Sequence, residues 1–152
     1  MSIIATIRRN RKSPRRHWGG AVLEAAIVVP VLLSLAFGTV EFGYYFFVKN
    51  TLQGAAREGA RAAIISTSVY TDVTTAVTSS LTGAGMTTIT TTIQKTTSGV
   101  TTTVTSGNYS GIVSGDTLTV TVTANWGTVG IRPLGLIPTS KNFSGVAVMR
   151  RE

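Results

Sequence analysis

The chain has 152 residues, a mean hydropathy of +0.28 and a formal charge of +8. This length fits one modest domain plus a membrane anchor, and the hydropathy is high for a soluble protein. Six basic residues precede the first long apolar run, which leaves only +2 for the rest of the chain. Because no basic face or aromatic platform follows them, the composition argues against nucleic-acid binding. The sequence has no cysteine, which excludes disulfides and thiol catalysis.

An apolar run without charge separates Glu24 from Glu41, and its apolar character continues to Lys49. The run is long enough for a membrane-spanning helix of about 20 residues. Because the basic residues lie before it, the positive-inside rule places the N-terminus in the cytoplasm and the chain after Lys49 outside. We interpret Glu41 as a rim charge near the outer membrane interface.

These signals divide the chain into three parts. We expect a basic leader at residues 1–19, the transmembrane part of an N-terminal helix at 20–48, and an extracytoplasmic α+β domain at 49–152. A secretory signal peptide is an alternative interpretation of the same stretch. Such a peptide has a shorter apolar core, of about 7 to 15 residues, and a small-residue cleavage site. The run in this chain is longer and ends in aromatic residues, which favours a single-pass membrane protein.

Helical periodicity continues beyond the membrane segment to about residue 65. In TLQGAAREGARAAI, small and apolar residues recur at spacings of three and four, and the charged residues gather on the other side. Ala55, Gly59 and Ala63 form a small-residue stripe that suits close helix packing, either against partners or under the chain's own sheet. A helix over 20–65 is about 70 Å long at 1.5 Å per residue, so its second half belongs to the extracytoplasmic domain.

After Ser66 the sequence is rich in threonine, valine and glycine. The segment VYTDVTTAVTSSLTGAGM predicts a short second helix that ends at its glycines. The segment DTLTVTVTA alternates strictly and predicts a half-buried strand. TTITTTIQK and VTTTVT predict a hairpin across TSG, and FSGVAVMR predicts a last strand. The sequence therefore predicts an α+β fold, in which the long N-terminal helix packs on a small antiparallel sheet with strands within residues 86–150.

The segment NWGTVGIRPLGLIPTSKN is predicted to be a loop by its glycines and prolines. Its apolar residues look exposed, which makes the loop a candidate contact surface, although the same residues are also suited to cap the sheet. They are Trp126, Ile131, Leu134, Leu136 and Ile137.

The chain offers little material for catalysis. Its single histidine, His17, lies in the leader, so a histidine base, a histidine-based triad and a histidine metal site are not expected. After Glu58 the carboxylates are Asp72, Asp116 and Glu152, and none is paired in sequence with another. Asp116 follows a glycine and is expected to be a turn residue. We therefore predict no enzyme activity, no cofactor or metal, and no small-molecule substrate.

The segment GGAVLE resembles the processing site of type IV pilin-like precursors, in which a glycine precedes the cut and a glutamate lies fifth in the mature chain. Cleavage after Gly19 would make Gly20 the first residue and Glu24 the fifth. The block from Arg15 to Ile65 is similar to the TadE-like family, minor pseudopilins of the tight-adherence (Tad) pilus. The similarity rests on the glutamate, the apolar run with an internal proline, the FG and EFG segments and AAREGARAA.

The resemblance implies a pilin-like, non-catalytic pilus assembly component of the bacterial inner membrane. Its implied partners are the membrane, other pilin or pseudopilin subunits, a prepilin peptidase and the Tad inner-membrane assembly machinery. In a bundle of cleaved subunits, the new α-amino group of one chain can pair with Glu24 of its neighbour. Two alternatives stay open: Glu24 snorkels at the cytoplasmic boundary of an uncut anchor, or the chain is an uncleaved single-pass scaffold that recruits envelope partners.

Overall fold

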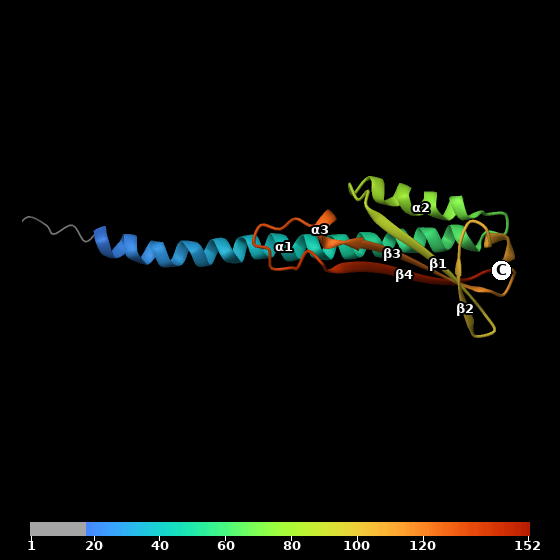
Figure 1. The fold of residues 1–152 in the computed structure, drawn as a ribbon. Helices are drawn as coiled ribbons and strands as arrows, with labels where there is room; N and C mark the ends of the chain where they lie inside the picture. Colours follow the sequence, from blue (N-terminus) through green and yellow to red (C-terminus); the bar gives the residue numbers. More distant parts are fainter. Residues whose placement is uncertain (1–17) are drawn as a thin grey trace, which may run out of the picture. The chain divides into compact units, whose positions relative to one another are not determined.

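The computed structural model describes residues 18–152, as helices and one four-stranded sheet (Figure 1). The described chain divides into two units, the first ending at Leu35 and the second comprising Ala36–Glu152. In chain order the elements are α1 (Trp18–Ile64), α2 (Tyr70–Thr82), β1 (Ile89–Thr97), β2 (Val100–Val104), the 3₁₀ turn η1 (Tyr109–Gly111), β3 (Thr117–Asn125), α3 (Trp126–Val129) and β4 (Asn142–Arg150).

The sheet has the strand order β2-β1-β3-β4, and every neighbouring pair is antiparallel. Strand β3 lies between β1 and β4, so Val120 pairs with Ile93 on one side and with Ala147 on the other. Its alternation buries the apolar residues and leaves the threonines half-buried, as the sequence predicted. The turn between β1 and β2 places Ser98 and Gly99 at positive φ, which fits a tight two-residue hairpin.

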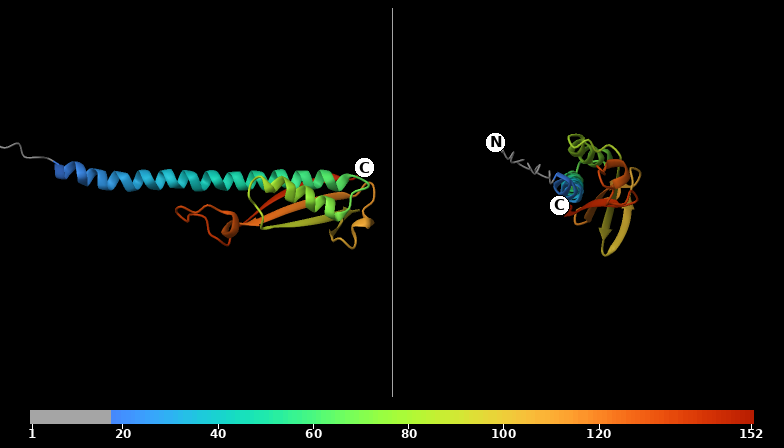
Figure 2. Two further views of the ribbon diagram at one scale, coloured as in Figure 1. Left: turned by 90° about the horizontal axis from the view of Figure 1, so that it is seen from above. Right: turned by 90° about the vertical axis from the view of Figure 1, so that its left-hand side faces the viewer.

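One face of this sheet carries the hydrophobic core, and the C-terminal part of α1 and the shorter α2 cover that face (Figure 2). The predicted α+β fold, with a long N-terminal helix on a small antiparallel sheet, is confirmed. The helices contribute Val48, Leu52, Ala55, Ala56, Ala60, Ala63, Val73, Val77 and Leu81, and the sheet contributes Ile93, Val104, Leu118, Val120, Val122, Ala124, Phe143 and Ala147.

Gly59 lies at a close contact between α1, α2 and the sheet. A Cβ atom at this position would lie 2.6 Å from a methyl group of Val77 on α2 and 3.1 Å from one of Val120 on β3. Ala55 and Ala63 are also buried in this core. The small-residue stripe therefore packs within its own domain, and a role for it in contacts between subunits stays a prediction.

The edge strand β4 lies directly against α1. A Cβ atom at Gly145 would overlap the backbone of Leu52 and Gln53, so only glycine permits this approach. The side chain of Gln53 pairs with the free edge of the strand: its Nε2 donates to the Val146 carbonyl over 2.7 Å, and its Oε1 accepts from the Val146 amide over 3.2 Å. This amide occupies backbone groups that an edge strand otherwise leaves unpaired.

Asp116 ties the turn before β3 to the end of β1. Its carboxylate is buried and accepts hydrogen bonds from the Thr97 hydroxyl and the Val113 amide. These two bonds, with the positive charges of Lys95 and Arg151, outweigh the effect of burial and lower the pKa of Asp116 below its usual value. The expected turn aspartate is thus also a buried structural anchor.

We predict that Gly59→Ala destabilises the domain by about 1 to 3 kcal/mol, because the added methyl group overlaps Val77. Gly54→Ala is the matched control, since Gly54 lies in the same helix and a Cβ there meets no atom within 4 Å. Both substitutions gain about 1 kcal/mol of helix propensity, so their difference in thermal unfolding isolates the packing effect. Equal unfolding temperatures for the two variants would contradict the packing described for Gly59.

The lowered pKa of Asp116 predicts a specific dependence of stability on pH. A carboxyl group whose pKa is lower in the folded chain stabilises the fold above its unfolded pKa of about 3.9, and this stabilisation is lost as the pH falls through the folded pKa. We expect Asp116→Asn to lower the free energy of unfolding by about 1 to 3 kcal/mol at neutral pH. The difference from wild type should shrink below about pH 4. Glu58→Gln, at an exposed position of α1, controls for the loss of one negative charge.

Candidate functional site

The predicted processing and assembly residues lie in the first turns of α1. Gly19, Gly20 and Glu24 are all exposed, and a Cβ atom at either glycine would meet no atom within 4 Å. Within residues 18–152, the Glu24 carboxylate has no hydrogen bond or ion pair. The basic leader falls outside the described residues, apart from its last two positions.

The surface of this part of α1 is apolar. The helix contains a stretch that is long and apolar enough to cross a membrane, judged by length and composition, and none of that stretch is buried. Large exposed side chains continue along it. Those up to Leu35 are Val22, Leu23, Ile27, Val28, Val29, Val31, Leu32, Leu33 and Leu35 itself.

Glu41 differs from Glu24 in burial and in hydrogen bonding. Its side chain is fully buried, although it lies in the same apolar stretch of sequence. Its Oε1 accepts a hydrogen bond from the Ile137 amide over 2.9 Å, and its Oε2 accepts one from the Leu134 amide over 3.2 Å. Glu41 was expected to be a rim charge, but its carboxylate is buried in the protein and ties α1 to the loop between α3 and β4. Its place near the outer membrane interface stays a prediction.

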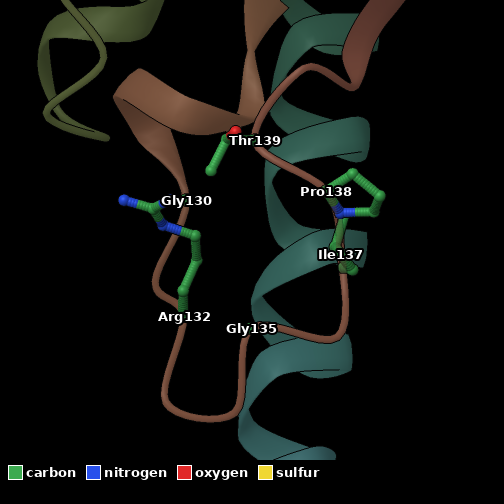
Figure 3. Close-up of a pocket in the computed structure, with 6 residues that line it drawn as sticks. All are labelled: Gly130, Arg132, Gly135, Ile137, Pro138 and Thr139. Carbon is green, nitrogen blue, oxygen red and sulfur yellow. The ribbon is translucent and has the colours of Figure 1, made fainter.

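This loop, residues 130–141, folds back along α1 (Figure 3). Two backbone hydrogen bonds hold the ends of the loop together, from the Trp126 amide to the Lys141 carbonyl and from the Gly127 amide to the Thr139 carbonyl. Gly135 has a positive φ of 68° at the tip, which lets the backbone turn there. Figure 3 shows Ile137 beside α1, whereas Arg132 extends on the side away from the helix.

The sequence left two alternatives for the five apolar residues of this segment, an exposed contact surface or a cap on the sheet. Trp126 and Ile137 are buried, which excludes the first alternative for these two and fits the second. The indole of Trp126 packs against Tyr44, Tyr45 and Phe143, with ring centroids 5.4 to 6.3 Å apart. These aromatic side chains fill the space between α1 and the start of β4. Ile131, Leu134 and Leu136 are exposed, as predicted.

A shallow pocket of about 490 Å³ lies in the concave side of the loop, lined in part by Arg132, Ile137 and Thr139 (Figure 3). Within the described part of the chain, no three histidine, aspartate or glutamate side chains lie together as a metal site would need.

Sequence reasoning missed the contact between Glu41 and the loop. The position of Glu41 in an apolar stretch was an indirect signal, because a carboxylate in such surroundings requires a partner. The partners are backbone amides, and amides of a loop some 93 to 96 residues away carry no mark in the sequence.

Residues 19–61 match the family model described as TadE-like protein. The match covers Gly19, Gly20, Glu24 and Glu41, and of the small-residue stripe it covers Ala55 and Gly59 but not Ala63. It confirms the resemblance inferred from the sequence. Comparisons with curated proteins and with solved structures found no match.

We predict that Glu41→Gln loosens the loop without unfolding the sheet. A glutamine oxygen accepts one amide, but its NH₂ group cannot accept the second. Because a hydrogen bond to a charged group contributes about 1.5 to 3 kcal/mol, amide hydrogen exchange at Leu134 and Ile137 should speed up by roughly tenfold or more. Exchange at Val120 in the central strand serves as the internal reference, and Glu24→Gln is the matched control. Unchanged exchange at both loop amides would show that the carboxylate does not hold the loop.

Proposed function

We propose that this protein is a minor pseudopilin of a Tad-type pilus, inserted in the bacterial inner membrane and cleaved between Gly19 and Gly20 by a prepilin peptidase. The match of residues 19–61 to the TadE-like family and the exposed apolar surface of α1 support this proposal. We further propose that residues 20–48 contain the membrane span and that 49–152 form the extracytoplasmic domain. The protein contributes contacts to the assembly rather than chemistry.

The contrast between the two glutamates of the apolar stretch carries the proposal. Glu41 finds its hydrogen-bond donors within the same chain, whereas Glu24 has none among the described residues. A charged side chain in a membrane costs about 2.5 to 3.5 kcal/mol at the centre and less near the boundary, so Glu24 needs a partner from outside the described residues.

Cleavage would supply such a partner. The cut at Gly19 creates a positively charged α-amino group on Gly20, and in a bundle of parallel subunits this group can pair with Glu24 of the next chain. A paired and hydrogen-bonded charge avoids the cost of an isolated buried one. The small side chains around the bond favour the peptidase as well, because glycine permits close approach of another backbone.

Cleavage and assembly make separable demands on these residues. We predict that Gly19→Arg leaves the leader attached, because the arginine side chain obstructs the peptide bond. Glu24→Gln should permit cleavage but weaken incorporation by about 1 to 3 kcal/mol, since the amide cannot neutralise the neighbouring amino group. Mass spectrometry follows the leader, and co-purification with sheared pili or with the assembly complex follows incorporation. Glu58→Gln is the control for charge, because Glu58 is exposed on α1.

Two results would overturn the proposal. Incorporation of Glu24→Gln at the wild-type level would make Glu24 a boundary residue without an assembly role. A Gly19→Arg chain that still begins at Gly20 would exclude a prepilin-type site, and an uncleaved scaffold would then describe the protein better.

A further inference from the structure

The tip of the α3–β4 loop presents aliphatic side chains to the outside. Ile131, Leu134 and Leu136 are 49%, 40% and 54% exposed, and all three lie within six consecutive residues. Between Trp126 and Ser140 the only charged residue is Arg132. Clustered exposed apolar side chains mark an interaction site more often than single ones do.

Contacts within the second unit fix where this tip lies along α1. A Cβ atom at Gly38 would be 3.9 Å from a methyl group of Leu134 and 3.9 Å from one of Leu136. The hydrogen bonds to Glu41, one turn further along the helix, hold the tip at that level. The loop thus packs beside residues 38–41 of α1.

Under the proposed function, the same level corresponds to the outer edge of the membrane. A helix crosses the hydrocarbon core with about 20 residues, so a span that starts at Gly20 ends close to residue 40. Neighbouring residues of α1 are themselves large and exposed, notably Phe37 and Phe42. The loop tip therefore continues the exposed apolar surface of α1 around residues 37–42.

We propose that the loop tip, Ile131–Leu136, inserts into the outer leaflet of the membrane that α1 crosses. This inference rests on the proposed function, which supplies the membrane and the orientation of the chain. Arg132 fits the same position, because its guanidinium extends away from α1 and suits a lipid phosphate group at the interface. The carboxylate of Glu41 is buried beneath the tip, so the charge is kept from the lipid by backbone amides.

The insertion gives the domain a second contact with the membrane. If α1 were the only contact with the membrane, the helix and the domain packed on it could rotate together about the helix axis. A loop that is embedded in lipid on one side of the helix limits that rotation. The domain would then present a fixed side to neighbouring subunits before assembly.

The sequence has no cysteine, so single cysteines can be placed and labelled with an environment-sensitive fluorophore. We would reconstitute the full chain in phosphatidylcholine and phosphatidylglycerol vesicles that contain brominated acyl chains. Labels at Leu136→Cys and, as a second position, Ile131→Cys should lose most of their emission to the brominated lipid. Val148→Cys is the matched control, because Val148 is aliphatic and exposed on β4 but lies away from the loop, and its label should not be quenched.

A label at Leu33→Cys, on the exposed surface of the apolar stretch, reports the span itself. Quenching at position 33 without quenching at 131 or 136 would overturn the insertion and leave the proposed function intact. A loop label that is shielded from water but not quenched would indicate a contact with protein, and this result would also overturn the insertion of the loop. Absence of quenching at position 33 would contradict the membrane anchor, and with it both proposals.

Discussion

The structure depends on one constraint. A single continuous helix has to expose an apolar surface over its first part and pack tightly into a protein core over its last part. The sequence meets this constraint with two kinds of residue. Large aliphatic side chains cover the helix up to Leu35, and small ones follow wherever another backbone comes close. Gly59 and, on the opposing strand, Gly145 mark the contacts at which any larger side chain would separate the helix from the sheet.

The two glutamates of the apolar stretch differ in whether the chain itself supplies hydrogen-bond donors for the carboxylate. Glu41 is satisfied by two backbone amides of a distant loop, and this contact fixes the loop against the helix. Glu24 has no equivalent within the described chain, which leaves its charge available for a partner. One glutamate is therefore structural, and we propose that the other belongs to the assembly of subunits.

The fold was largely predictable from the sequence, because its determinants are local. The alternation of Leu118, Val120 and Val122 indicated a half-buried strand, and the Ser98–Gly99 turn fits the predicted hairpin. The errors arose where long-range contacts decide the outcome. The sequence could not decide whether Trp126 lies on an exposed surface or caps the sheet, and aromatic partners from α1 and β4 bury it. The partners of Glu41 were equally invisible, since backbone amides leave no trace in residue type.

We propose that this chain is a precursor whose cleavage creates the partner for Glu24. The most direct test is the intact mass of the wild-type protein extracted from membranes, with and without an active prepilin peptidase. We expect a product that begins at Gly20 when the peptidase is active, and a chain that keeps its leader when it is not. A chain that keeps its leader in the presence of the active peptidase would show that the protein is not a prepilin-type precursor.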